Sequence, residues 1–288
     1  MISIGLAGWG DHPQLYGPRL KAAGKLAAYS EHFPIVEADS TFYAVPKPEQ
    51  FDRWAAETPA SFSFLIKAFQ EMTGHARGLK RYDDEAVMFR EFLQGIEPCR
   101  TAGKLFAVLF QYPPWFDCTR ANVELLRRTK ARIGDLPAAL EFRHRSWFTD
   151  KMRDKTLAFM EQEGWIHSIC DEPDAGPGSI PAVLQATDRE LTVVRFHGRN
   201  TAGWNGGGRA DWREVRYLYR YNEDELQEWA QKIRDLERQS RHIAVIFNNN
   251  SGGDAAGNAK QLMRLLGMTP KEMAPEQMEW SELTDFEG

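Results

Sequence analysis

The sequence predicts a single-domain α/β barrel of the TIM type, in which eight parallel strands alternate with helices. Two observations predict it: eight short apolar runs recur along the 288 residues, and most gaps between them carry helical patterns. Continuous rather than alternating apolar runs are typical of strands that are buried on both faces of a parallel sheet. The length is also close to the roughly 250 residues of such a barrel.

The eight predicted strands are spaced as βα units require. They span residues 2–9, 35–39, 62–67, 105–111, 138–144, 165–171, 191–197 and 242–249. Seven of them stay mostly apolar and then end in polar or charged residues. Because barrel enzymes keep their chemistry at the C-terminal ends of the strands, these endings predict the place of the functional site.

Helical patterns fill most of the gaps between these strands. The expected helices span residues 24–33, 48–58, 83–99, 119–133, 150–164, 223–240 and 255–267. Residues 172–183 are rich in proline and glycine, which predicts an irregular crossover instead of a helix. The connections 68–82 and 198–222 are unusually long, and loops of this length in compact domains are usually lids or binding loops.

The acidity of the chain is concentrated at its C-terminus. The net charge is −5, and residues 269–288 contain one lysine against six acidic residues, so residues 1–268 are neutral. We therefore expect a barrel domain over residues 1–268 and an acidic tail over residues 269–288. A neutral body lacks the basic patch of nucleic-acid-binding proteins.

Composition also bears on the location of the protein. No apolar run approaches the roughly 20 residues that a membrane span requires, and no basic region precedes the first run. The three cysteines are widely spaced and form neither a disulfide framework nor a zinc-binding pattern. We expect a cytoplasmic protein with no membrane partner.

Cationic side chains follow several of the predicted strands, so we expect them to meet at the rim of one end of the barrel and to form an anion-binding site. The candidates are Lys67, Arg143, Arg195 and Arg199. Arginine forks match phosphate or carboxylate oxygens in a bidentate way, and lysine adds a point charge. Asn248 and Asn249 end the last strand, and Trp204 lies in a glycine-rich loop, so these three residues are further candidates for ligand contacts.

Acidic and histidine side chains of the same rim supply candidates for proton transfer. Glu37 and Glu141 lie deep at strand ends and are the candidate bases, while His197 is a candidate proton donor or acceptor. An equally consistent role for the glutamates is a salt bridge to Lys67 or Arg195, because buried charge must find a partner.

A divalent-metal site is an alternative interpretation of these strand-end residues. Carboxylates and imidazoles are ligands that Zn²⁺, Mn²⁺ or Mg²⁺ accept. The candidates of these types are Glu37, Glu141, Asp171, His75, His144 and His197. No HExxH or similar spacing supports it, and the nearby arginines repel a divalent cation, so a metal is not favoured. The sequence shows no motif for an organic cofactor.

Seven motifs carry a resemblance to a known family. They are GW at 8–9, VEADSTFYAVP at 36–46, FSFLIK at 62–67 with His75 beyond it, LFQYPPWF at 109–116, EFRHRSW at 141–147, RFHGRN at 195–200 and FNNNSGGDAAGNA at 247–259. In order and spacing, over about residues 2–267, they resemble the YecE-like family, domain of unknown function 72. The resemblance implies a TIM-type barrel and a bacterial-type cytoplasmic protein, but no reaction. The place of His75 in this signature favours a catalytic role for it.

These observations favour an enzyme of the hydrolase or isomerase type that acts on a phosphorylated or otherwise anionic small molecule. Arg143, Arg195 and Lys67 would hold the anion, Glu37 or Glu141 would act as the base, and His197 would exchange a proton. Two alternatives stay open. One is a non-catalytic nucleic-acid-binding or regulatory barrel, and the other is a metal-dependent enzyme of the phosphodiesterase, endonuclease or sugar-isomerase type.

Overall fold

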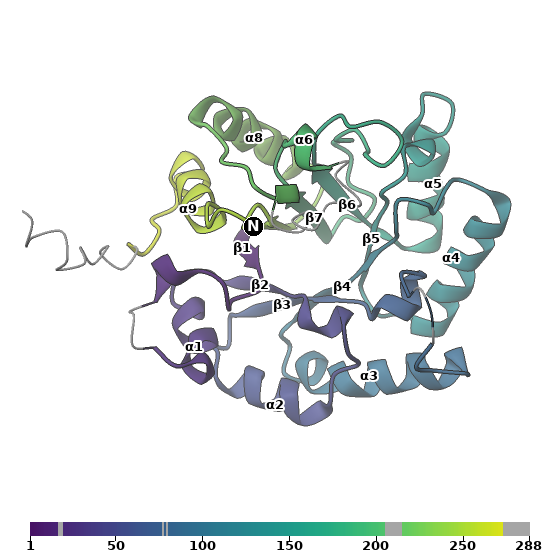
Figure 1. The fold of residues 1–288 in the computed structure, drawn as a ribbon, viewed down its shortest axis with the longest axis horizontal. Helices are drawn as coiled ribbons and strands as arrows, with labels where there is room; N and C mark the ends of the chain where they lie inside the picture. Colours follow the sequence, from purple (N-terminus) through teal and green to yellow (C-terminus); the bar gives the residue numbers. More distant parts are fainter. Residues whose placement is uncertain (17–19, 77, 79, 205–214, 273–288) are drawn as a thin grey trace, which may run out of the picture.

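The computed structural model describes residues 1–16, 20–76, 78, 80–204 and 215–272. Its eight strands are parallel and close into a barrel in the order β1 to β8, which confirms the predicted fold (Figure 1). The strands are β1 (Ile2–Ala7), β2 (Ile35–Ala38), β3 (Ser63–Lys67), β4 (Leu105–Gln111), β5 (Ala138–Glu141), β6 (Ile166–Asp171), β7 (Leu191–Phe196) and β8 (His242–Phe247).

Helices surround this barrel, and their ends lie within a few residues of those that the sequence predicts, except for the short α6, which lies in a predicted loop. They are α1 (Lys25–Ser30), α2 (Pro48–Ala56), α3 (Glu85–Thr101), α4 (Arg120–Ile133), α5 (Arg153–Glu163), α6 (Thr201–Trp204), α8 (Glu223–Leu236) and α9 (Ala255–Leu265). Short 3-10 turns are η1 (Pro13–Leu15), η2 (Ala22–Gly24), η3 (Ser40–Phe42), η4 (Gln70–Thr73) and η5 (Arg145–Phe148). As predicted, residues 172–183 form neither a helix nor a strand.

Side-chain caps fix where several helices begin. Asp84 and Thr119 accept backbone N–H groups at the starts of α3 and α4. At the start of α8, Asn222 and Glu225 form a reciprocal capping box. Each cap satisfies backbone donors that the first turn leaves unpaired and contributes about 1 kcal/mol.

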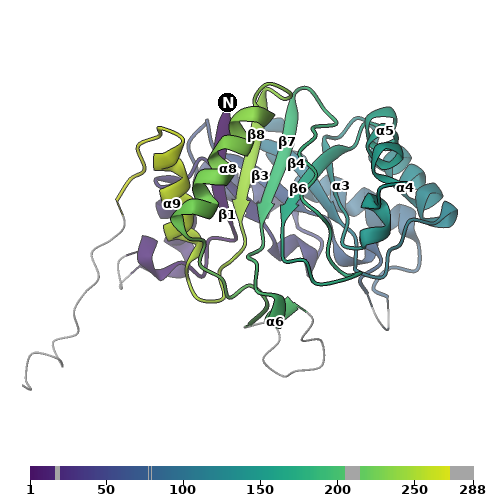
Figure 2. The ribbon, with the colours of Figure 1, turned by 90° about the horizontal axis from the view of Figure 1, so that it is seen from above.

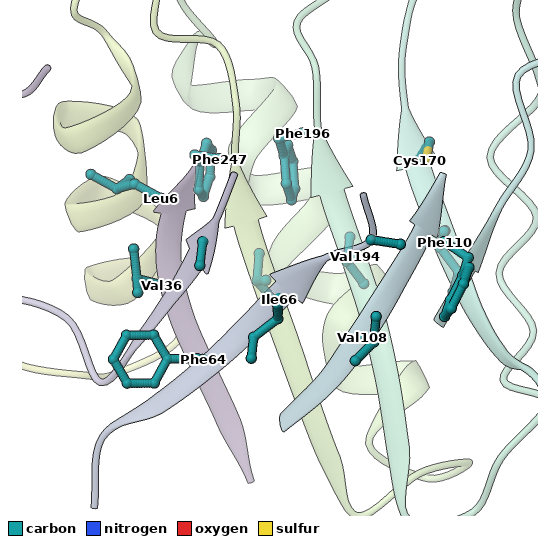
Figure 3. Close-up of a cluster of buried hydrophobic side chains, with 14 of the residues drawn as sticks. Leu6, Val36, Phe64, Ile66, Val108, Phe110, Cys170, Val194, Phe196 and Phe247 are labelled. Carbon is teal, nitrogen blue, oxygen red and sulfur yellow. The ribbon is translucent and has the colours of Figure 1, made fainter. Parts of the chain in front are cut away.

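Alternation along the strands divides the buried side chains into two cores. The inner core fills the barrel and consists mainly of Ile35, Leu65, Ala107, Leu109, Ala139, Ile166, Val193, Ala244 and Ile246. The outer core packs the barrel against the helices, and Figure 3 shows Val36, Ile66, Val108, Val194 and Phe247 from it. Small residues in the inner core allow close approach: a Cβ atom on Gly5 would lie 2.0 Å from the carbonyl oxygen of Ile35.

The carboxyl ends of the strands carry the long connections. Figure 2 shows α6 at these ends, on the opposite side of the barrel from the N-terminus. Asn200 joins the two ends of the connection 198–222, because its Nδ2 donates to the carbonyl oxygens of Val215, at 2.9 Å, and Leu218, at 3.2 Å. Residues 205–214 of this predicted lid lie outside the described residues, as do residues 77 and 79 of the other long loop.

The predicted acidic tail is described only over residues 269–272, so the proposed division at residue 268 stays a prediction. Within the described part of the chain, no helix combines the length and the apolar character that crossing a membrane requires.

Candidate functional site

Arg195, near the end of β7, lies at the centre of the barrel's carboxyl end. Its Nε and Nη2 donate to the two carboxylate oxygens of Glu37, at 2.9 and 2.7 Å, in a bidentate pair that reaches from β7 to β2. Its Nη1 donates to Glu141 Oε2, on β5, at 2.7 Å. All three side chains are at most 1% exposed. The ion pairs therefore tie three separated strands together above the inner core.

Arg143 follows β5 and shares one of these carboxylates. Its Nε donates to Glu141 Oε1 at 2.6 Å, and its Nη1 donates to Glu172 Oε2 at 3.1 Å. Ser168 donates to the other oxygen of Glu141 at 3.2 Å. Burial raises the pKa of Glu141, but the charges of Arg195 and Arg143 outweigh it and hold that pKa well below 4.5. Glu141 is therefore an anion that anchors two arginines, and its basicity is low.

His197 lies between the two guanidinium groups. Its Nε2 is 2.9 Å from Arg143 Nη2 and 3.3 Å from Arg195 Nη1. Burial lowers the pKa of His197 well below 6.5, and the two arginines lower it further. Because a guanidinium offers only donors, Nε2 accepts from the two arginines. Nδ2 of the Asn248 amide lies 3.1 Å from Nδ1, at the other nitrogen of the ring.

Glu172, in the irregular crossover after β6, is a site residue that the sequence prediction missed. Its side chain is fully buried beside Arg143. Its Oε1 accepts the backbone N–H of Ile180 at 2.5 Å. Burial raises the pKa of Glu172 to about 7, with Arg143 opposing the rise. This carboxyl group can therefore gain or lose a proton near neutral pH.

Trp204 and two further residues of the predicted lid 198–222, Arg216 and Tyr217, cover the arginines. The Trp204 ring lies 5.3 Å from the guanidinium carbon of Arg143 and 4.3 Å from that of Arg216. Its Nε1 donates to the carbonyl oxygen of Gly178 at 3.1 Å. The Tyr217 ring lies 5.9 Å from the His197 ring and 6.3 Å from the Trp204 ring. The structure thus brings the predicted Trp204 into the site and adds Arg216 and Tyr217.

Lys67, the last residue of β3, faces the same group of charges. Its Nζ lies 4.7 Å from the centroid of the Phe42 ring. Burial lowers the pKa of Lys67, Glu37 opposes this effect, and Arg195 adds to it. Lys67, Glu37, Glu141, Arg143 and Arg195 form the predicted cluster, and the structure does bring them together.

Arg199 lies outside this cluster. It forms an ion pair with Asp171, with Nη2 2.9 Å from Oδ1, and its Nη1 is 3.1 Å from Glu225 Oε1 on α8. Tyr221 donates to the same aspartate at 2.6 Å. The reason is Gly198: its φ of +81° interrupts the alternation of β7, so the next side chain turns toward α8. Arg199 braces the start of the predicted lid instead of facing the arginine pair.

Asn249 and His75 also lie beside the cluster. Asn249 donates to the carbonyl oxygen of Tyr219 and to Asn258 Oδ1, both at 2.9 Å, so it holds the far end of the same connection. Nδ1 of His75 lies 2.9 Å from the Thr73 hydroxyl, and its ring lies 5.1 Å from Phe42, which also contacts Lys67. The ligand role predicted for Asn249 and the catalytic role predicted for His75 stay predictions.

Glu141, Cys170 and His197 are candidate metal ligands, because their possible ligand atoms lie within 4.8 Å of one another. However, both Glu141 oxygens and His197 Nε2 already accept hydrogen bonds from arginine. Burial raises the pKa of the Cys170 thiol well above 9, which disfavours the thiolate that a metal would bind. A divalent cation would have to displace two guanidinium groups, so these residues do not fit one well.

The alternation of side chains along β6 could have identified the missed residue Glu172. Ile166 belongs to the inner core, and Ser168 contacts Glu141, so Cys170 and Glu172 follow in phase toward the site. The sequence prediction included Asp171 in the rim because it ends the apolar run. Its side chain instead points away from the cluster, toward Arg199 and Tyr221. Arg216 and Tyr217 had no such signal, because they lie in a connection whose path the strands do not determine.

The Arg195 ion pairs generate a prediction about stability. Arg195→Met leaves two buried carboxylates without this partner, and we expect it to lower the free energy of unfolding by about 3–5 kcal/mol. Adding Glu37→Gln restores part of the loss, because it removes the carboxylate that has no other arginine. Urea unfolding of the single and double variants measures both effects. Arg238→Met, in an exposed ion pair, is the control and changes the value by about 0.5 kcal/mol or less. An Arg195→Met variant as stable as the wild type would contradict the bracing role.

Glu172 generates a prediction about pH. Its pKa is about 7 in the folded chain, above its ordinary value of 4.5, so the folded state binds its proton more tightly than the unfolded state does. This contribution is fully present below pH 4.5 and is lost as the pH rises through 7. Between pH 5 and pH 8, the wild type should therefore lose about 1–3 kcal/mol relative to Glu172→Gln. Urea unfolding of both proteins at the two pH values checks this, and an unchanged difference between them would refute it.

The chain has close relatives in sequence. A family model described as "Protein of unknown function DUF72" matches residues 3–282. UPF0759 protein YunF of Bacillus subtilis (strain 168) is 52% identical over 280 residues, which cover 97% of this chain and 99% of that protein. UPF0759 protein YecE of Escherichia coli (strain K12) is 32% identical over 157 residues, or 54% of each protein.

Solved structures agree with these relatives. A crystal structure of a DUF72 family protein from Enterococcus faecalis V583 matches with a TM-score of 0.88 at 34% identity, covering 97% of this chain and 100% of that one. A DUF72 family protein from Thermotoga maritima MSB8 matches with a TM-score of 0.79 at 30% identity, covering 93% and 99%. The chain therefore belongs to the DUF72 family of proteins of unknown function.

Proposed function

We propose that this protein is an enzyme of the hydrolase or isomerase type that acts on a small phosphorylated or carboxylated molecule at the carboxyl end of the barrel. The observation that carries the proposal is the pair of buried guanidinium groups of Arg143 and Arg195, which share Glu141 and both contact His197. Their charges also act on Tyr217. Burial raises the pKa of a phenol, but four cationic groups outweigh it and lower the pKa of Tyr217 below 10. These groups are Arg216, Arg143, Lys67 and Arg195. A place that stabilises a phenolate also stabilises a bound anion.

Arg143 and Arg195 are the proposed anion ligands. Counted over the described residues, their hydrogen bonds to glutamate and His197 leave N–H donors on Nη1 and Nη2 of Arg143 and on Nη2 of Arg195. The glutamates hold both guanidinium groups in place before a ligand arrives. Little side-chain entropy is then lost on binding, which favours affinity and precise orientation.

We assign proton transfer to Glu172 and Tyr217 instead of Glu37 and Glu141. Glu37 accepts both of its hydrogen bonds from Arg195, and the low pKa of Glu141 makes it a weak base. The pKa of Glu172, at about 7, suits a group that takes up a proton and returns it at neutral pH. The lowered pKa of Tyr217 suits an acid that protonates a ligand oxygen.

The same proposal covers the setting of the enzyme. Cys99, Cys118 and Cys170 are free thiols, which a reducing compartment preserves, so we place the protein in the cytoplasm. Arg143 and Arg195 are each 1% exposed and paired with glutamates, whereas a nucleic-acid-binding protein presents its cations as a patch or stripe. We therefore take a small anionic molecule as the ligand.

Anion binding tests the proposal. Isothermal titration with inorganic phosphate, glycolaldehyde phosphate and pyruvate should give binding by the wild type. Arg143→Gln should weaken that binding by tenfold or more, the equivalent of about 1.4 kcal/mol for one charge-assisted contact. Arg238→Gln, in an exposed ion pair just past the C-terminal end of α8, serves as the control and should bind as the wild type does. Wild-type protein that binds none of these anions, or an Arg143→Gln variant of unchanged affinity, would exclude this function.

A further inference from the structure

The half-buried Lys67 differs from the buried Lys104 and Lys260 in what its ammonium contacts. Lys104 Nζ donates to three oxygens of Ala55 and Thr58, at 2.6 to 2.8 Å. Lys260 Nζ lies 2.9 Å from His32 Nδ1 and donates to the carbonyl oxygen of Lys271. Among the described residues, Lys67 Nζ has no hydrogen bond or ion pair, and its contact is with the face of the Phe42 ring.

An amine in this position is available to a ligand. The Lys67 side chain is only half-buried, so its Nζ can be reached from solvent. Burial also lowers the pKa of Lys67, with Arg195 adding to the effect and Glu37 opposing it, so the share of neutral amine is larger than in an exposed lysine. A neutral amine with an unshared electron pair is a nucleophile. Neither the bracing of the barrel nor the binding of an anion by the arginines requires this group.

We propose that Lys67 forms an imine with the carbonyl carbon of an aldehyde or ketone whose anionic group is bound by Arg143 and Arg195. The inference rests on the proposed function and narrows its substrate class to small phosphorylated or carboxylated carbonyl compounds. Lys67 ends β3, while the arginines lie at the end of β7 and after β5, so the amine and the anion ligands approach one ligand from different sides of the barrel.

The step balances without an external reagent. The Nζ lone pair forms the C–N bond, the C=O π electrons move to oxygen, and a proton moves from nitrogen to that oxygen to give a carbinolamine. The C–O bond then breaks as a proton from an acid reaches the oxygen, water leaves, and the nitrogen lone pair forms C=N, which gives the iminium ion. Return of the remaining N–H proton to the conjugate base of that acid gives the imine, so the overall change is carbonyl plus amine to imine plus water.

Two neighbouring groups suit the proton transfers. The charges of Arg216, Arg143 and Arg195 lower the pKa of the Tyr217 hydroxyl, so that Tyr217 can protonate the departing oxygen. Glu172, with a pKa of about 7 and bonded to Arg143, can remove a proton from the carbon next to the iminium. Such removal is the central step of an isomerisation, because the iminium accepts the electron pair that the proton leaves behind.

Reductive trapping tests the inference on the full-length protein. The protein is incubated with sodium cyanoborohydride and glycolaldehyde phosphate, dihydroxyacetone phosphate or pyruvate, and the modified lysine is located by peptide mass spectrometry. We expect about one adduct per chain, on Lys67. The phosphate-bearing and carboxylate-bearing probes distinguish the two kinds of anionic group.

Three lysine variants sharpen the test. Lys67→Arg keeps the positive charge and should lose the adduct, whereas Lys260→Arg and Lys104→Arg change enclosed lysines elsewhere and should keep it. Adducts spread over other lysines with Lys67 unmodified, or no adduct on Lys67 with any probe, would overturn the inference. If Lys67→Arg does not fold, the position of the adduct in the wild type decides, with Lys260 and Lys104 as internal controls.

Phosphate titration of the same preparation separates this inference from the function it rests on. Phosphate binding without an adduct on Lys67 overturns the imine and leaves the anion site in place. An adduct on Lys67 without phosphate binding overturns the anion site instead.

Discussion

The guanidinium group of Arg195 is a buried cation at the centre of the barrel's carboxyl end, and the rest of the site depends on how it is neutralised. Its bonds to Glu37 and Glu141 join β7 to β2 and β5 above an inner core of small and branched residues. Buried ion pairs add little net stability compared with apolar residues of similar size, because desolvation offsets their attraction. Net stability alone therefore does not account for this arrangement. Under the proposed function, the same pairs that brace the strands also hold the arginines ready for a ligand.

The same ion pairs set the protonation of the surrounding groups. Glu141 shares its charge with two arginines and has a lowered pKa, while His197 stays neutral between the same two arginines. Glu172 meets only one of them and has a pKa of about 7. Carboxyl groups in one site thus have different roles because their numbers of cationic partners differ. Glu37 and Glu141 orient the arginines, and the proposed function assigns proton transfer to Glu172.

The barrel could be predicted from the sequence because each strand is a short, continuous apolar run. Strands of this kind are buried on both faces, as in a parallel sheet covered by helices. The arginine and glutamate cluster could also be predicted, since strand ends meet at one rim. The direction in which single side chains point could not be predicted. Arg199 pairs with Asp171, because Gly198 turns the chain after β7. Glu172 points into the site, in phase with Ser168. Arg216 and Tyr217 lie in a long connection, and no periodicity fixes where such a segment returns.

The most direct measurement is a crystal structure of the protein soaked in selenate, with the anomalous signal of selenium locating the anion. We predict a selenate ion in hydrogen-bond contact with Nη atoms of both Arg143 and Arg195, with Glu37 and Glu141 still paired to Arg195. Selenate bound only to lysines and arginines on the outer surface, with this position empty, would contradict the claim that the ion pairs prepare an anion site.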